Sequence, residues 1–167
     1  MRQTLAAFSS WLELTPFSQA LQTVAWAVPA IQTVHILAIA AVMGSMLLFN
    51  LRLLGLRGMD VPLARARSRF LPVIWFSVLV LLATGLLMIA AEPGRSLLNP
   101  VFQLKMGLLL CAVVLTAATD RFLLRSPAPK SDGLARVRVA RASAILSVGL
   151  WVAILCAGRW IAYVRVH

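Results

Sequence analysis

The sequence predicts an all-α protein: an integral membrane four-helix bundle with a short amphipathic helix at its N-terminus. Hydrophobic residues make up 61% of the 167 residues and charged residues only 13%, whereas soluble domains contain about 45–50% and about 25%. The apolar residues also gather into four runs, each long enough to cross a bilayer core as a helix of about 20 residues. No second domain is indicated, so we expect residues 1–167 to form a single four-span domain.

The first helix is predicted close to the N-terminus, where Leu5, Phe8 and Leu12 recur at helical spacing. Such a helix either lies in the bilayer interface or docks as a cap on the bundle. The pair Thr15-Pro16 then predicts a new helix start, because threonine caps helices and proline is tolerated in the first turn.

Four membrane spans follow, at residues 26–54, 70–91, 101–119 and 143–164. Gly55 marks the end of the first span, and Pro72 is expected in the first turn of the second. The segment Glu92–Arg95 reads as a tight polar turn, and Asn99-Pro100 repeats the signal of a cap followed by proline. Ser131 or Asp132 can cap the fourth helix.

The basic residues predict the orientation of these spans. Eleven of the sixteen Lys and Arg residues flank the connectors after the first and third spans: Arg52, Arg57, Arg65, Arg67, Arg69, Arg121, Arg125, Lys130, Arg136, Arg138 and Arg141. By the positive-inside rule this side is cytoplasmic. We therefore expect a multi-pass protein of the bacterial inner membrane with both termini in the periplasm. Its basic loops would meet anionic lipid, and nothing favours nucleic acid as a partner.

His35 lies deep within the first predicted span. An unpaired charge at such a position costs several kcal/mol, so the imidazole must be neutral or have a partner. The other histidine, His167, is the last residue and lies outside the predicted spans. On a helical wheel the face of His35 also carries Val28, Gln32, Ile39, Val42, Met46 and Asn50. His35 is therefore the first candidate for a metal or cofactor ligand.

Small residues four positions apart lie on other faces of the same span: Ala40 with Gly44, and Ala41 with Ser45. Such pairs allow a neighbouring helix to approach closely. We expect this packing to leave the His35 face directed into the bundle or a cavity.

Lys105 and Arg159 enter the third and fourth spans from the same side as His35, and Glu92 ends the second span on that side. These groups and Gln32 predict a polar pocket in the outer half of the bundle. Its cations could hold a carboxylate, a porphyrin propionate or a quinone oxygen. The alternative is that the two cations extend to the lipid headgroups and His35 bonds a backbone carbonyl.

The chain resembles known membrane proteins at several of these positions. His35-Ile36, Gly44 and Arg52-Leu53, together with Phe102 and Lys105, resemble the His-Ile…Gly…Arg-Leu and Phe-x-x-Lys pattern of HemJ-type and CopD-type proteins. The segment from Trp11 to Pro16 is similar to the Trp-Leu-Glu-x-Thr-Pro start of a group of small four-span bacterial proteins of uncharacterised function.

These resemblances imply a four-helix membrane bundle that binds haem b and works with a redox partner, or one that handles copper. His35 would be the metal ligand. HemJ-like sequences carry a further histidine near the end of the third span, where this chain has Thr116, Thr119 and Asp120. Two imidazoles from one protomer therefore cannot share a haem, and the iron would be five-coordinate or completed by Met, Lys105 or a second copy in a homo-oligomer.

Three functions remain open at the level of the sequence. The leading one is binding of haem b, or of a small hydrophobic ligand, in the pocket formed by His35, Gln32, Lys105, Arg159 and Glu92. The second is a non-enzymatic membrane subunit or scaffold. The third is a copper or small-solute permease component, for which Met88 and Met106 could lie close to His35 and for which several protomers would have to assemble. Hydrolytic chemistry is not supported, because no Ser-His-Asp set, phosphate loop or pair of carboxylates at one depth is present.

Overall fold

Long apolar helices dominate the computed structural model, which describes residues 2–56, 60, 62–121 and 133–160. They are α3 (Ala27–Leu54), α4 (Leu63–Ala91), α6 (Pro100–Thr119) and α7 (Gly133–Trp160). The mean hydropathy of the most apolar part of each lies between 2.0 and 2.6, and all four are long enough to cross a membrane. The all-α fold and the number of apolar helices predicted from the sequence are confirmed.

Several helix boundaries follow from the predicted capping residues. The side chain of Thr15 accepts a hydrogen bond from the backbone N–H of Ser18, and that of Asn99 accepts one from Val101. Gly55 ends α3 with a φ of 74°, in the left-handed region that glycine adopts without steric cost. The predicted caps of α7, Ser131 and Asp132, lie outside the described residues, as does the predicted end of that span near Val164.

Two local predictions are wrong. Pro72 is not in the first turn of its helix, because α4 already begins at Leu63 and includes Arg65, Arg67 and Arg69 of the predicted connector. The carbonyl that loses its partner to Pro72 belongs to Ser68, which is exposed, so solvent can replace the missing bond. The expected polar turn after Glu92 is the short helix α5 (Pro93–Leu97), with proline in its first turn.

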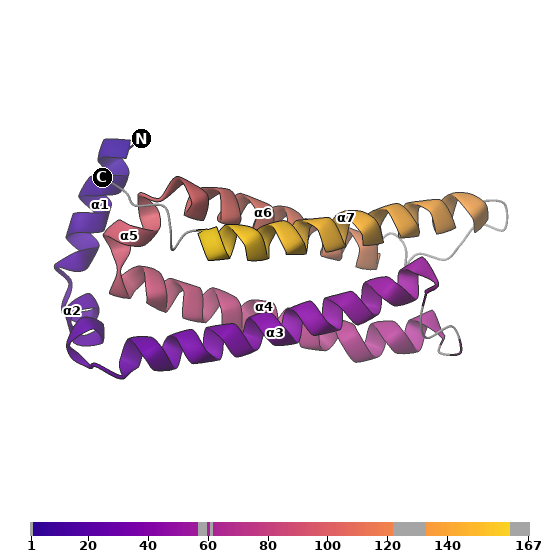
Figure 1. Ribbon diagram of the computed structural model, residues 1–167, viewed down its shortest axis with the longest axis horizontal. Coiled ribbons are helices and arrows are strands. Elements are labelled where there is room, and N and C mark those ends of the chain that lie inside the picture. The colour runs from indigo at the N-terminus through magenta and orange to yellow at the C-terminus, as the bar shows by residue number, and fades with distance from the viewer. Residues whose placement is uncertain (1, 57–59, 61, 122–132, 161–167) are drawn as a thin grey trace.

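The helices α1 (Arg2–Glu13) and α2 (Pro16–Thr23) lie across one end of the four long helices (Figure 1). α1 packs against α5, and α2 packs against the end of α4. Ser18 Oγ donates to the Ala90 carbonyl at 2.7 Å, and Gln22 Nε2 donates to the Ala91 carbonyl at 3.0 Å. Carbonyls in the last turn of a helix have no partner within it. α2 thus caps the C-terminus of α4.

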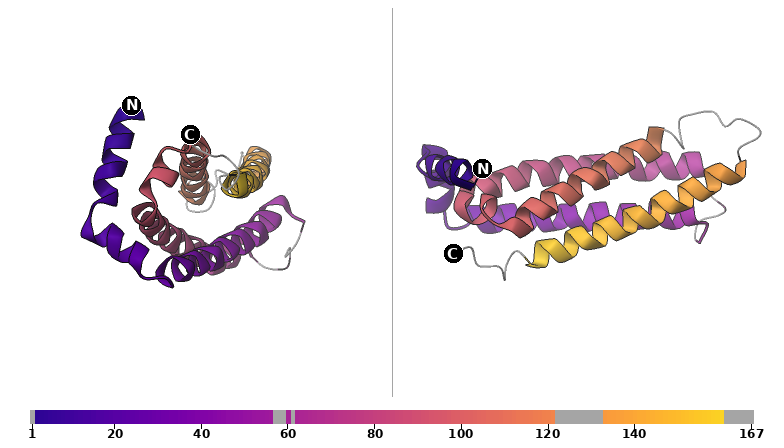
Figure 2. Two further views of the ribbon diagram at one scale, coloured as in Figure 1. Left: turned by 60° about the vertical axis from the view of Figure 1, so that its left-hand side comes forward. Right: turned by 90° about the horizontal axis from the view of Figure 1, so that it is seen from above.

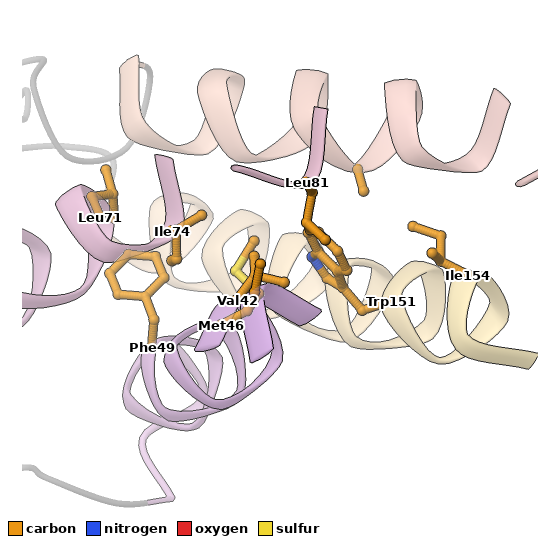
Figure 3. Close-up of a cluster of buried hydrophobic side chains, with 10 residues drawn as sticks. Val42, Met46, Phe49, Leu71, Ile74, Leu81, Trp151 and Ile154 are labelled. Atoms are coloured by element: carbon orange, nitrogen blue, oxygen red, sulfur yellow. The ribbon is translucent and has the colours of Figure 1, made fainter. Parts of the chain in front are cut away.

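The long helices form two antiparallel pairs, α3 with α4 and α6 with α7 (Figures 1 and 2). The pairs meet chiefly where α3 packs on α7. Val42, Met46, Leu81 and Trp151 are buried between them in the middle of the bundle (Figure 3). Among the described residues, α4 and α6 show no comparable packing on each other.

Polar side chains join the pairs in the half of the bundle away from α1. Asn50 Nδ2 donates to Ser147 Oγ at 3.1 Å, and both side chains are buried. Near that end Arg67 of α4 forms a two-pronged ion pair with Asp120, which follows α6. The two pairs are therefore fastened away from α1, while closer to α1 the space between them widens into a cavity.

The predicted close approach at the small residues of α3 does not occur within the described chain. Ala40, Ala41 and Gly44 are exposed, and a Cβ added at Gly44 would meet nothing within 4 Å. The neighbours of α3 instead pack on the face that carries Val42, Met46 and Phe49.

Candidate functional site

A cavity of about 460 Å³ lies between the four long helices in the half of the bundle nearer α1 and α5. All five residues of the predicted polar pocket line it: His35, Gln32, Lys105, Arg159 and Glu92. α3 supplies His35 and Gln32, while Lys105 comes from α6 and Arg159 from the last turn of α7. The structure therefore brings together groups that lie up to 127 positions apart in the chain, from Gln32 to Arg159.

His35 is held in place by a residue of the neighbouring helix. Its Nδ1 lies 2.7 Å from Thr84 Oγ1, and that oxygen lies 2.7 Å from the Val80 carbonyl. A hydroxyl has one proton to donate, and a carbonyl can only accept. When Thr84 donates to Val80, it accepts from His35 Nδ1–H. This pattern assigns the proton to Nδ1 and leaves the lone pair on Nε2, the atom that a metal or a proton would use.

Two glycines make room for the polar groups. A Cβ added at Gly85 of α4 would lie 3.8 Å from His35 Cε1, and one added at Gly158 of α7 would lie 3.7 Å from Lys105 Nζ. Both glycines line the cavity. Larger side chains at either position would occupy the space into which the imidazole and the ammonium group extend.

Lys105 is half-buried, about 8 Å beyond the start of α6 at a rise of 1.5 Å per residue. Across the residues that the structure describes, its ammonium group forms no ion pair or hydrogen bond with the protein. Glu92 and Arg159 line the same cavity and are exposed. Glu92 also lines an adjoining hollow with Glu13 and Gln22, so the carboxylate stands at the end of the cavity beneath α1 and α2.

Apart from Ser96, the rest of the cavity wall is apolar. Trp151 and Ile154 of α7 and Leu81 of α4 extend into it from the core shown in Figure 3. Three methionines also line it: Met43, Met88 and Met106. No group of three or more His, Cys, Asp and Glu side chains that could hold a metal occurs in the described ranges. The methionines add thioether groups, which are soft metal ligands, to the cavity that His35 lines.

Comparison with known proteins places the chain in a family. Residues 11–164 match the family described as "Family of unknown function (DUF6644)". The chain belongs to this family. No curated protein and no solved structure matches the sequence. The resemblance to HemJ-type and CopD-type proteins is therefore a hypothesis about this DUF6644 protein, and it rests on the residues quoted above.

In this DUF6644 protein, sequence reasoning missed Thr84, Gly85 and Gly158. Threonine and glycine are ordinary residues in membrane helices, so neither stands out within an apolar run. Their roles depend on which helix lies opposite, which periodicity does not reveal. Thr84 and Gly85 form an adjacent polar and small pair in an otherwise apolar stretch, and this was the available signal.

Proposed function

We propose that the protein binds a redox cofactor, haem b, in the cavity, with His35 as an axial ligand. The arrangement of His35 and Thr84 carries this proposal. The hydrogen bond to Nδ1 fixes the ring and leaves Nε2 as the nitrogen with a free lone pair, at the edge of an apolar cavity. Metal-binding histidines are commonly oriented in this way by a bond at the other ring nitrogen.

The residues around the cavity fit a haem in three respects. The volume of about 460 Å³ falls within the range of about 300–1,000 Å³ that is typical of ligand pockets. Lys105 and Arg159 supply positive charge for the propionates. Met43, Met88 and Met106 line the same cavity, and a thioether from one of them would complete the hold on the iron, since the third span lacks a histidine. A bound haem would supply one-electron chemistry, and these side chains would hold and orient it.

The visible absorption spectrum of the purified protein tests this proposal. A Soret band that shifts on reduction is expected, and it should be lost in His35→Ala while the protein remains folded and extractable. One buried polar side chain contributes little to the packing of four apolar helices. His167→Ala is the matched control and should keep the band. A variant lacking His35 but retaining the full haem content would contradict the proposal.

Copper binding is the second candidate, because three methionines line the same cavity as His35. Thioether and imidazole ligands together suit Cu(I). Metal analysis of the same preparations separates the two candidates: copper without a Soret band supports this function, and haem without copper supports the first. A colourless, metal-free protein would favour a non-enzymatic scaffold.

We also place the protein in a bacterial inner membrane with both termini in the periplasm. The charge distribution supports this, since Arg52 is in the last turn of α3 and Arg65, Arg67 and Arg69 follow the start of α4, and these helix ends lie away from α1 (Figure 1). In this orientation the cavity lies in the periplasmic half of the bilayer, and anionic lipid headgroups of the cytoplasmic leaflet meet the arginines.

A further inference from the structure

The ammonium group of Lys105 has no counter-charge among the residues that the structure describes. Its ammonium group lies at an apolar cavity wall, beside Gly158, and no described carboxylate pairs with it. Charged side chains inside membrane helices are costly and generally meet a partner charge or a ligand. Arg159 of α7 adds a second positive charge at this cavity, and Glu92, at the end beneath α1 and α2, adds one negative charge, so positive charge is in excess. The electrostatics of the cavity therefore suit an anionic group.

The cavity is also open sideways. α3 and α4 pack along their length, whereas α4 and α6 do not pack closely within the described part of the chain. Leu82 and Leu86 of α4 and Met106 of α6 line the cavity, yet their side chains are 52%, 58% and 40% exposed. Residues that face both a cavity and the surface form the rim of an opening. At this depth on an apolar helix, that surface faces lipid chains rather than water.

We propose that the cavity takes up a long-chain carboxylic acid from the bilayer, with the carboxylate at Lys105 and the acyl chain passing between α4 and α6. The positive charge of Lys105 favours the carboxylate. The apolar rim formed by Leu82, Leu86 and Met106 contacts the acyl chain, which is poorly soluble in water. The volume of about 460 Å³ suits one small head and the first part of one chain better than a two-chain phospholipid. This inference rests on the proposed function only in that both use the same cavity, and it does not require haem.

The test uses stearic acid carrying a nitroxide near its carboxyl group, added to the purified full-length protein in detergent. The bound probe should give an immobilised component in the electron paramagnetic resonance spectrum, and unlabelled oleate should displace it. Lys105→Met should weaken binding about tenfold or more, because it removes a charge-assisted bond. Arg141→Met, a change at an exposed cation of α7 that does not line the cavity, should leave binding unchanged.

Two further probes check the chemistry of the head. The methyl ester of the same labelled acid should bind about tenfold more weakly than the acid, because it has no charge for Lys105 to meet. Equal binding of ester and acid would overturn the proposal. Displacement by phosphatidylglycerol as effectively as by oleate would also overturn it, and would identify a phospholipid headgroup as the anion.

The route is tested by narrowing the opening. Leu86→Trp places a large ring at the rim and should slow uptake of the labelled acid at least several-fold. Leu79→Trp is the matched control, because Leu79 is an exposed leucine of the same helix that does not line the cavity. Equal slowing by both variants, or by neither, would refute entry between α4 and α6.

His35→Ala separates this inference from haem binding. It removes the proposed iron ligand but keeps Lys105, so this variant should lose haem and still bind the acid. Wild-type protein that binds the acid without any haem leaves this inference intact and ends the haem proposal. Protein that carries haem but shows no immobilised probe, even after haem removal, ends this inference alone.

Discussion

At the scale of single residues, the cavity shows which polar groups a sequence reveals. His35, Lys105, Gln32, Glu92 and Arg159 stand out because polar or charged side chains are rare within or beside apolar runs. Their convergence at one cavity agrees with the depth that their positions in the four spans predict. The residue that orients His35 could not be found in this way, because a threonine satisfied by its own helix resembles any other.

Thr84 provides the sharpest test of the assigned tautomer. Thr84→Val keeps the shape of the side chain but removes the acceptor for His35 Nδ1–H. We expect haem affinity to fall about 10–100-fold, the usual effect of losing a group that orients a metal ligand. Titration of the haem-free protein with haem, followed by absorbance, measures this change.

Thr84→Ser retains the hydroxyl and should bind haem like the wild type. If Thr84→Val binds as tightly as the wild type while His35→Ala does not bind, His35 is oriented by something other than this hydrogen bond.

At the scale of helices, the capping residues predicted helix ends correctly, whereas the structure of the segments between the helices was predicted less well. Thr15, Asn99 and Gly55 act where the sequence predicts, because capping and the left-handed conformation are local effects. α5 was missed because Pro93 and Gly94 are typical of turns, and it is the packing of α1 that holds this segment in a helix. The early start of α4 was missed because hydropathy detects the apolar part of a helix and not its polar extension beyond the membrane.

The cap that α2 places on α4 predicts a local effect of Ser18→Ala. Ser18 is fully buried, and its loss leaves the Ala90 carbonyl without this donor, at a cost of about 1–3 kcal/mol. Backbone amides of α2 should then exchange hydrogen about tenfold faster or more, while those in the middle of α3 and α4 exchange as before. Hydrogen exchange read by mass spectrometry measures both regions.

Ser10→Ala is the control for this prediction, because Ser10 is exposed and bonds only the carbonyl of Ala6 in its own helix. Unchanged exchange of α2 in Ser18→Ala would show that the remaining contacts of α2 with α4 and α3, including the Gln22 bond, hold it without the Ser18 hydrogen bond.

At the scale of the whole molecule, hydropathy was sufficient for the number of long helices but not for their pairing. Four apolar runs of adequate length predict four helices whatever their neighbours are. Which helices pack together depends on the shapes of their surfaces. The small residues of α3 predicted close packing on a face that has no neighbour within the described chain, because close approach also requires a helix whose surface fits. The opening between α4 and α6 was therefore invisible in the sequence.

The orientation in the membrane is the prediction for the whole chain. A fluorescent protein that folds only in the cytoplasm should stay dark when fused after His167 and should fluoresce when fused after Arg125, within the second basic connector. The arginines at that end of the bundle are the physical reason, since they resist transfer across the membrane. Bright fusions after His167 would invert the topology and move the cavity to the cytoplasmic half.

The pairing of the helices also has a consequence for the order of events during synthesis. α3 and α4 are neighbours in the chain, as are α6 and α7, so each pair can assemble as soon as its second helix has been inserted. The contact of α3 with α7 joins the pairs, and these two helices are separated in the chain by α4, α5 and α6. Contacts of long sequence separation form late. We therefore expect the cavity to form last, after α7 has been synthesised and inserted. Any ligand of the cavity would then bind after all four long helices are in place, and not while the earlier ones are being synthesised.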